Sequence, residues 1–345
     1  MTAAQPWSDD VVLDVTALSV AFPADEGVVR AVSDLSYRAR LGRTLAIVGE
    51  SGSGKSVASM AVLGLHDPSR TRITGSIRLD GHELVGAPEW VLQSVRSTHA
   101  AMVFQDPLSA LHPLHRVGAQ IAEAYRAHHE VSRATAQRRA VEMLDRVGIP
   151  NPDRRAKQFP HEFSGGMRQR AMIALGLVNN PRLLIADEPT TALDVTVQAQ
   201  ILDLVRDLQQ EFGSAVILIT HDLAVVAETA DDLLVMYAGR AVEQGDAKAV
   251  LARPSHPYTA GLLQSLLSPS EELTELRTIP GAPPSLLAIP PGCSFHPRCP
   301  FADRVGAPCQ TVLPGWRPAP GLVNRHLRCH LTDPVVAIQE TGGLR

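Results

Sequence analysis

A glycine-rich loop directly after a short apolar run constrains the fold of this 345-residue chain more than any other segment. The run at 44–48 has the length and composition of a buried strand, and residues 57–65 have the composition of a helix. The loop between them matches the pattern G-x-x-x-x-G-K-[ST] in full. It consists of Gly49, Glu50, Ser51, Gly52, Ser53, Gly54, Lys55 and Ser56. A strand, such a loop and a helix in this order predict an α/β fold with a nucleotide-phosphate site.

The residue types of this loop suit a phosphate ligand. Glycines let the backbone fold so that several N–H groups point inward, and the following helix adds its positive end. Lys55 would place a charge on the β- and γ-phosphates, and Ser56 would offer its hydroxyl to Mg²⁺. Val57 completes the segment that we expect to bind the nucleotide. The alternative is a purely structural glycine turn.

Two adjacent carboxylates follow another short apolar run, residues 183–186. If that run is a parallel strand, its end lies at the same edge of the sheet as the phosphate loop. Asp187 would then hold Mg²⁺, directly or through water, and Glu188 would orient or deprotonate the attacking water. The alternative role is a turn or helix-capping acid, since Pro189 comes next.

The remaining pattern also predicts an α/β core. Residues 11–40 alternate apolar and polar side chains around a turn at 23–27, which indicates two strands. Residues 115–147 and 195–212 have helical spacing, and the run at 215–219 fits a further central strand. Alternation of strands and helices favours a layered sheet covered by helices.

Composition excludes several classes of protein. The hydrophobic share of 45% excludes a wholly disordered chain, and 32 basic against 36 acidic residues exclude a globally basic nucleic-acid binder. No apolar run reaches the roughly 18 residues of a spanning helix, and residues 1–10 lack the pattern of a signal peptide. We therefore expect a cytosolic chain that cannot itself form a path through a membrane.

The composition changes near residue 250. Fifteen of the 26 prolines and all four cysteines lie in residues 251–345. Proline breaks helices and sheet ladders, so we expect a nucleotide-binding domain at 11–250 and a loop-rich extension at 251–345. The cysteines are Cys293, Cys299, Cys309 and Cys329, spaced C-x5-C-x9-C-x19-C. Their residue types permit an iron–sulfur cluster, a zinc site without the usual close pairs, or free thiols.

Residues 163–170, which read FSGGMRQR, resemble the signature sequence of ATP-binding cassette (ABC) proteins. Ser164 lies 23 residues before Asp187, where that family places it. Further elements of the same resemblance occur in the expected order. They are the loop glutamine Gln105, the residue Asp194 of the loop that joins two nucleotide domains, the switch histidine His221, and Phe22 as an aromatic that stacks on adenine or belongs to the core. Met167 departs from the family pattern, which often has glutamine there.

The resemblance implies a P-loop NTPase of ABC fold, with a RecA-like core, an N-terminal antiparallel β subdomain and a helical signature subdomain at about 105–180. It implies that two such domains pair head to tail around two ATP molecules. Catalysis would rest on Glu188 and His221, and Mg²⁺ on Ser56, Gln105 and Asp187. The residues expected to contact the partner's ATP in trans are Ser164, Gly165, Gly166 and Asp194.

Three other stretches are similar to the peptide/nickel importer ATPases. They are residues 108–114, residues 255–266 with the sequence His-Pro-Tyr, and residues 292–300. The similarity implies an ATP-hydrolysing subunit that energises uptake of di- or oligopeptides, or of nickel or another small solute, at the cytoplasmic face of the membrane. Its implied partners are a second, related ATPase in a heterodimer, two transmembrane permease subunits and an extracellular or periplasmic substrate-binding protein, with no nucleic acid. It also favours a [4Fe–4S] cluster on Cys293, Cys299, Cys309 and Cys329.

Two other functions remain as alternatives. An ABC protein acting on nucleic acid could use the excess of 11 basic over seven acidic residues in 105–180, although solvated helix faces or a docking surface explain that excess as well. Such proteins usually fuse two cassettes, which 345 residues do not show. A nucleotide-gated module without turnover is opposed by the presence of both Glu188 and His221.

Overall fold

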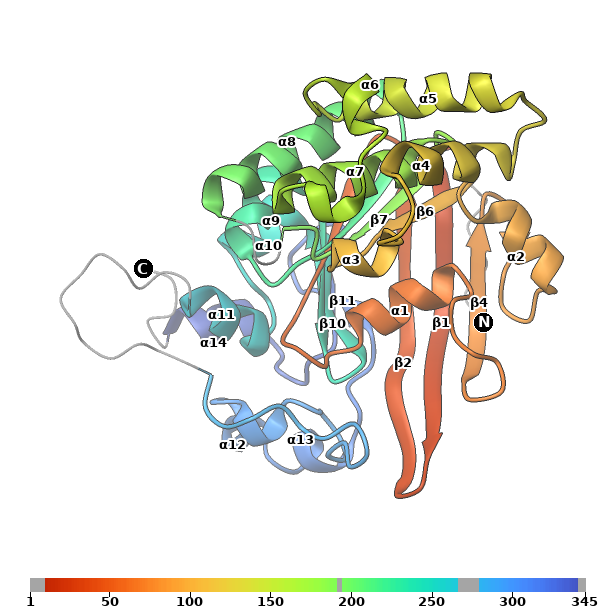
Figure 1. Ribbon diagram of the computed structural model, residues 1–345. Coiled ribbons are helices and arrows are strands. Elements are labelled where there is room, and N and C mark those ends of the chain that lie inside the picture. Colours follow the sequence, from red (N-terminus) through yellow and green to blue (C-terminus); the bar gives the residue numbers. More distant parts are fainter. Residues whose placement is uncertain (1–9, 191–193, 266–278, 341–345) are drawn as a thin grey trace.

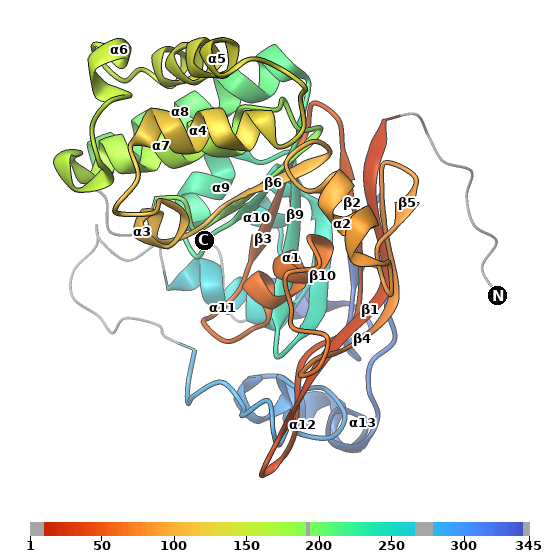
Figure 2. The same ribbon diagram turned by 45° about the vertical axis from the view of Figure 1, so that its right-hand side comes forward.

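The computed structural model describes residues 10–190, 194–265 and 279–340 (Figures 1 and 2). At its centre is an eight-stranded sheet in the order β11-β12-β10-β9-β3-β8-β7-β6. Its strands are β3 (Thr44–Val48), β6 (Ala100–Val103), β7 (Leu183–Asp187), β8 (Ala215–Ile219), β9 (Asp232–Tyr237), β10 (Arg240–Asp246), β11 (Arg317–Pro318) and β12 (His326–Leu327). The neighbours from β9 to β6 are parallel, and β10 begins the antiparallel edge. The predicted α/β fold is confirmed.

The three apolar runs singled out in the sequence are the central strands β3, β7 and β8. Every residue of these strands is buried, as expected for parallel strands covered on both faces. In their register Ala46 pairs with Leu218, and Asp187 pairs with Ile219. The pairing brings the carboxyl ends of the three strands, and the loops that follow them, to one edge of the sheet.

The alternating segment at 11–40 forms the long hairpin of a second, antiparallel sheet, in the order β2-β1-β4-β5. Its strands are β1 (Val11–Ala24), β2 (Gly27–Arg40), β4 (Arg72–Leu79) and β5 (His82–Glu83). Its inner face shares one hydrophobic cluster with β3 and the first helix, and that cluster includes Leu13, Leu35, Ile47 and Ala58. The antiparallel sheet is thereby packed beside the phosphate loop.

Helices cover the central sheet and build a separate helical layer at the top of Figure 1. Those beside the sheets are α1 (Lys55–Val62), α2 (Glu89–Val95), α8 (Val195–Phe212), α9 (Leu223–Thr229) and α10 (Ala247–Ala252). The helical layer contains α3 (Pro107–Ala110), α4 (Val117–Arg126), α5 (Arg133–Arg146), α6 (Pro152–Arg155), the 3-10 turn Pro160–Glu162 and α7 (Gly165–Leu177). The layer lies within the segment 105–180 that the sequence analysis proposed as a subdomain.

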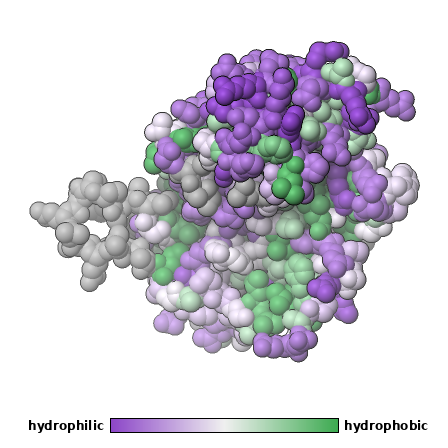
Figure 3. Space-filling model, viewed as in Figure 1, coloured by the Kyte–Doolittle hydropathy of each residue, from purple (hydrophilic) through white to green (hydrophobic). Residues whose placement is uncertain are grey.

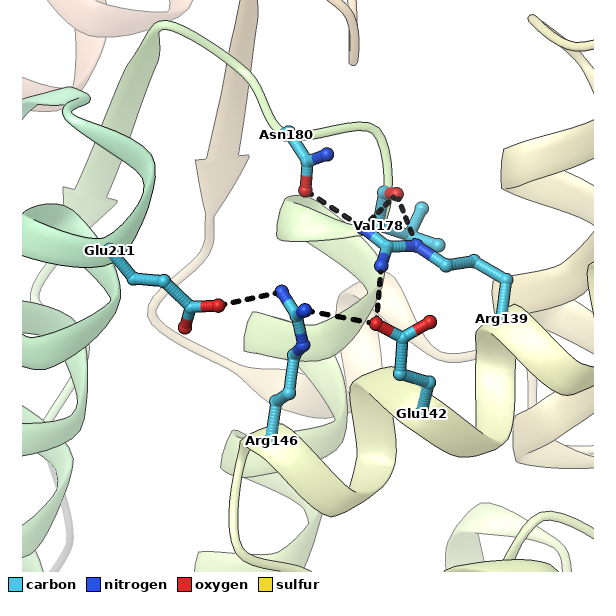
Figure 4. Close-up of polar contacts among 6 residues, drawn as sticks. All are labelled: Arg139, Glu142, Arg146, Val178, Asn180 and Glu211. Carbon is cyan, nitrogen blue, oxygen red and sulfur yellow. Dashed lines mark hydrogen bonds and ion pairs between the residues drawn. The ribbon is translucent and has the colours of Figure 1, made fainter.

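Polar contacts hold the helical layer together and join it to α8 of the core (Figure 4). On α5, Arg139 donates to the carbonyl of Val178 at 3.2 and 3.3 Å and to Asn180 at 2.8 Å. Arg146, also on α5, pairs with Glu211 of α8 at 2.9 Å. Hydrophilic side chains cover most of this layer on the face shown in Figure 3, whereas hydrophobic side chains gather lower on that face. The layer therefore meets the core through a buried apolar cluster with a polar rim.

The C-terminal extension joins the central sheet. Its short strands β11 and β12 continue the ladder beyond β10, and the carboxyl half of the chain also forms α11 (Pro257–Gln264), the 3-10 turn His296–Arg298, α12 (Ala302–Val305), α13 (Ala307–Thr311) and α14 (Pro334–Glu340). Residue 250, where the composition changes, lies inside α10. Tyr258 and Phe295 pack with Tyr237 of β9 in one buried cluster. The extension and the nucleotide-binding core thus share hydrophobic surface.

Residues 191–193, directly before Asp194, and Leu266, the last residue of the stretch 255–266, lie outside the described residues. Within the described ranges, no helix combines the length and apolar composition that crossing a bilayer requires.

Candidate functional site

The loop between β3 and α1 is shaped by glycines that no other residue could replace without strain. Gly49 has φ +156°, and a Cβ there would lie 2.2 Å from the carbonyl oxygen of Met236. Gly54 has φ +98°, and a Cβ would lie 2.3 Å from the carbonyl oxygen of Ala31. Backbone from β9 and β2 therefore approaches the loop so closely that only glycine fits. The motif predicted glycines here for phosphate binding, and packing against β9 and β2 requires glycine at Gly49 and Gly54 as well.

Lys55, the first residue of α1, folds back over its own loop. Its Nζ donates to the carbonyl oxygens of Gly49 at 2.8 Å and Glu50 at 3.1 Å. The side chain is buried, and burial lowers its pKa, while the charges of Glu188, Asp187 and Glu50 oppose that shift. Lys55 thus carries a desolvated ammonium group held over the loop, where a phosphate would replace backbone carbonyls as its partner.

Asp187 ends the buried strand β7 with 7% of its surface exposed. Burial raises the pKa of its carboxyl group, and a hydrogen bond with Ser56 acts in the opposite direction. Its Oδ1 atom is buried and has no hydrogen-bond partner among the described residues, and the same holds for Ser53 Oγ in the loop. A buried carboxylate oxygen without a partner, next to a serine hydroxyl, is the donor set that Mg²⁺ prefers. The residues present therefore fit Mg²⁺ bound with a nucleotide.

Glu188 follows at φ +46°, and its side chain is one-fifth exposed. Its Oε2 accepts a hydrogen bond from Gln105 Nε2 at 3.3 Å, and its Oε1 lies 3.5 Å from His221 Nδ1. Gln105 follows β6, Glu188 follows β7 and His221 follows β8. Three residues predicted separately from the sequence thus meet at one edge of the parallel sheet, with Lys55 close enough for the Glu188 charge to act on it.

The residues predicted to act in trans lie at helix starts. Ser164 caps α7 by accepting from the N–H of Met167 at 3.3 Å, and Asp194 caps α8 by accepting from the N–H of Val197 at 2.9 Å. Ser164 and Gly165 are exposed, and a Cβ at Gly165 would meet open space, whereas Gly166 packs against Val197. Ser164 and Gly165 are thus accessible to a partner.

Phe22, the predicted adenine-stacking residue, lies near the end of β1. Its ring meets His66 edge to face with centroids 5.5 Å apart, and it packs against the cluster shared by the two sheets. His66 in turn bonds the carbonyl of Val57 at 2.8 Å, which connects Phe22 to the helix after the phosphate loop. The packing of the ring fits the core role, and stacking on adenine stays a prediction.

The four cysteines of the extension line one small pocket. Cys309 and Cys329 are buried and Cys293 and Cys299 are partly buried. Burial raises the pKa of the Cys293 thiol to about 11 and those of Cys299 and Cys329 to about 12, so the thiols are neutral at neutral pH. In the described part of the chain, no group of three or more His, Cys, Asp or Glu residues is arranged to hold a metal ion. The cysteines converge, but their arrangement is not that of a formed metal centre.

Two residues of the extension, which belong to the motif stretches 292–300 and 255–266 but were not predicted to lie at the nucleotide site, contact the phosphate loop. Arg298 pairs with the side chain of Glu50, and the hydroxyl of Tyr258 accepts from the N–H of Glu50 at 2.8 Å. They are separated from Glu50 by 248 and 208 positions in the sequence. No periodicity or motif spacing relates positions so far apart, and only the attachment of the extension to β10 brings them together.

Comparisons with known proteins agree with this geometry. The family model "ABC transporter" matches residues 32–191, and "Oligopeptide/dipeptide transporter, C-terminal region" matches residues 242–305. The oligopeptide transport ATP-binding protein OppD of Salmonella typhimurium is 49% identical over 91% of this chain and 95% of its own length. A putative peptide import ATP-binding protein of Brucella melitensis is 49% identical over 84% of this chain and 88% of its own length.

Among solved structures, the dimeric post-hydrolysis state of the ATP-binding cassette MJ0796 bound to ADP and phosphate superposes with a TM-score of 0.61 at 25% identity. It covers 68% of this chain and 98% of that chain. The likeness extends over the cassette, while the relatives above also cover the extension. This chain therefore belongs to the ABC transporter ATP-binding proteins of the oligopeptide/dipeptide transporter family.

Proposed function

We propose that this chain is the ATP-hydrolysing subunit of an ABC importer that takes up di- or oligopeptides across the cytoplasmic membrane. The main support for ATP hydrolysis is that Lys55, Asp187 and Glu188 lie together at one edge of the parallel sheet. The peptide cargo is supported by the names of the relatives, which are oligopeptide and peptide transport proteins, and by the matched C-terminal region.

Each side chain of the site would have a distinct task. The loop amides and Lys55 would bind the phosphates, and Lys55 would exchange its carbonyl partners for phosphate oxygens. Ser56, Gln105 and Asp187 would hold Mg²⁺, which neutralises charge on the β- and γ-phosphates when bound. Glu188 would accept the proton of the attacking water, while Gln105 and His221 orient that water and the γ-phosphate. Phe22 would stack on the adenine ring.

The site would be completed by a second cassette. The exposure of Ser164 and Gly165 at the start of α7 leaves a helix N-terminus available to a phosphate of the partner's ATP. The related structure of a dimeric cassette bound to ADP and phosphate supports such pairing. We propose a related second ATPase as the partner, with two permease subunits contacting the helical layer and a substrate-binding protein outside the cell. The chain would then lie peripherally on the cytoplasmic face of the membrane.

For the cysteines we propose a [4Fe–4S] cluster. The convergence of four thiols on one pocket walled by Phe295, Phe301 and Leu331 supports four-thiolate ligation in an apolar setting. Cluster binding would require the thiols to lose their protons and to move closer together, because burial now favours the neutral thiols. The cluster would join segments of an extension that is held partly by a small hydrophobic cluster of its own.

Uptake by cells tests the transport function. Cells that lack this chain, and the same cells carrying the native chain or Glu188→Gln, would be supplied separately with radiolabelled tripeptide and radiolabelled nickel. We expect tripeptide uptake with the native chain alone. If nickel uptake depends on the chain, nickel replaces peptides as the proposed cargo. If uptake of neither solute depends on the chain, both cargo assignments are contradicted.

Anaerobic purification tests the cluster. Iron and acid-labile sulfide in equal amounts, with a visible absorption band lost in Cys299→Ser, would support it. Zinc bound in a stoichiometric amount would mean that the cysteines hold zinc instead of an iron–sulfur cluster. A purified protein with neither metal would mean that the cysteines are free thiols.

A further inference from the structure

Arg298 of the extension forms a bidentate ion pair with the phosphate loop. Its two terminal nitrogens lie 2.7 and 3.1 Å from the two carboxylate oxygens of Glu50, the residue directly after Gly49. The Arg298 side chain is 6% exposed and that of Glu50 is 24% exposed. Two parallel bonds of this kind fix both the distance and the orientation of the two planar groups.

The Arg298 guanidinium is itself held rigidly. Its Nε donates to the carbonyl of Pro280 at 2.8 Å, and one terminal nitrogen also donates to the hydroxyl of Tyr237 at 3.3 Å. The group lies over the Tyr237 ring at 5.9 Å. Hydrogen bonding to Glu50 is the main cause of the raised pKa of Arg298, which keeps the guanidinium charged. Since Tyr237 ends the central strand β9, Arg298 is fixed to the sheet that carries the loop.

The backbone of Glu50 is engaged from both sides as well. Its N–H donates to the hydroxyl of Tyr258, which is fully buried, and its carbonyl accepts from Lys55 Nζ at 3.1 Å. The extension therefore holds the side chain and the amide of Glu50, while the phosphate-binding lysine holds its carbonyl. A displacement of Glu50 would alter a contact of Lys55 directly.

A buried ion pair is weak support for stability, because desolvation of both charges opposes their attraction. The fixed geometry of the pair matters more than its contribution to stability, because the loop must present several N–H groups to one ligand. A loop already held in its binding conformation loses less conformational entropy when the ligand arrives.

From these contacts we infer that Arg298 is a positioning residue for ATP binding, which acts through Glu50 to hold the phosphate loop in its binding conformation. Tyr258 supports the same residue through the backbone. The extension thus contributes to nucleotide affinity without touching the nucleotide. The inference rests on ATP binding by the loop, as proposed above.

The experiment measures the dissociation constant of MgATP by calorimetry, with Glu188→Gln present throughout to prevent turnover. Arg298→Gln, Arg298→Lys, Glu50→Gln and the double variant Glu50→Gln with Arg298→Gln would be compared. We expect Arg298→Gln and Glu50→Gln each to weaken binding about tenfold, in line with typical coupling between contacting residues. The double variant should bind MgATP no more weakly than the single variant with the larger loss of affinity. Lysine, which keeps the charge but loses the bidentate geometry, should restore binding in part.

Arg328→Gln is the matched control. Arg328 is an arginine of the same extension, 8% exposed, that pairs with Asp34 of β2 at 2.5 Å and lies over Trp316. Its loss should lower the melting temperature while leaving MgATP affinity unchanged. Amide hydrogen exchange of residues 44–62 without nucleotide should accelerate in Arg298→Gln and stay unchanged in Arg328→Gln.

Three results would overturn the inference. They are native affinity in a folded Arg298→Gln variant, equal weakening by Arg328→Gln, or fully additive losses in the double variant. If the chain with native Arg298 and Glu50 fails to bind MgATP, the proposed function fails instead. The two failures are therefore distinguishable.

Discussion

The side-chain amide of Gln105 donates a hydrogen bond of 3.3 Å to the carboxylate of Glu188, which joins the loops after β6 and β7. The other carboxylate oxygen of Glu188 faces His221 at 3.5 Å. Gln105 and His221 therefore both face the proposed base. Arrival of a γ-phosphate would offer Gln105 and His221 a new acceptor and leave Glu188 available to water.

The first prediction concerns Glu188. Glu188→Gln keeps the size and the acceptor oxygen of the side chain but removes the base. We expect ATP turnover to fall at least about 100-fold, the usual contribution of a positioned general base. ATP affinity should change by less than about threefold, because the phosphates are bound by Lys55 and the loop.

The matched control for this change is Glu142→Gln, which neutralises a half-exposed carboxylate on α5 (Figure 4). Its turnover should stay native. Steady-state phosphate release and calorimetric ATP binding measure the two quantities. Turnover that survives in Glu188→Gln would mean that another group activates the water.

The second prediction concerns the space around Gly54. Gly54→Ala would place a Cβ 2.3 Å from the carbonyl oxygen of Ala31 and would hold alanine at φ +98°. Backbone must shift to relieve this contact, so we expect ATP binding to be lost and stability to fall by roughly 1–3 kcal/mol. Gly315→Ala is the matched control, since its Cβ would also meet open space and Gly315 is not among the residues expected to contact ATP. Retention of ATP binding in Gly54→Ala would show that the loop adapts.

The sequence predicted β3, β7 and β8 because each is short, almost wholly apolar and followed by a loop that contains polar motif residues. Asp187 is an example: the apolar run before it indicated a buried strand, and the register then places it at the loop-bearing edge. Strands such as β10 were missed because Glu243, Gln244 and Gly245 give no alternation of apolar and polar residues.

Contacts between distant segments could not be predicted. Arg298 lies among prolines and cysteines in a loop-rich stretch, so nothing in its surroundings indicates burial, let alone a contact with Glu50. The pairing depends on how β12 joins β10 and on how Tyr258 and Phe295 pack on Tyr237. Tertiary packing of this kind is set by side-chain shapes that a single sequence does not reveal.

The third prediction is a loss of stability in acid that traces to His256. This residue is 1% exposed, and burial lowers its pKa to about 4 from the usual 6.5. Between these values the unfolded chain binds a proton that the folded chain does not, so stability falls as pH falls from 6.5 to 4. The full difference is about 3 kcal/mol.

His256→Asn tests this prediction, because asparagine can still accept from the N–H of Tyr258 as His256 does at 3.1 Å. We expect the free energy of unfolding of the variant to vary less with pH across this window. The buried carboxyl of Glu243 has a raised pKa and opposes the trend, but it is present in both proteins and cancels in their difference. Equal pH dependence of the two proteins would contradict the assignment.

The last prediction concerns the buried polar cluster that attaches the extension to the central sheet. Glu243 of β10 is fully buried and accepts from the N–H groups of Ser255 at 2.7 Å and His256 at 2.9 Å. Arg325, before β12, is 3% exposed, lies 3.8 Å from Glu243 and donates to the hydroxyl of Ser255 at 2.9 Å. Arg325→Met would remove the cation that lies beside the buried Glu243 carboxyl group and the donor to the Ser255 hydroxyl. We expect a loss of about 1–3 kcal/mol, the usual cost of leaving a buried polar group without its partner.

Hydrogen exchange would show where that loss acts. Because Arg325 precedes β12, amides of residues 317–328 should exchange faster in Arg325→Met, whereas those of β3 and β8 should stay protected. Arg317→Met is the control: Arg317 also lies in the extension, but it donates to the carbonyl of Cys329 and leaves no carboxylate unpaired. A uniform acceleration across the central strands would mean that the extension and the nucleotide-binding core unfold as one unit, so that the cluster at Glu243 stabilises the whole chain.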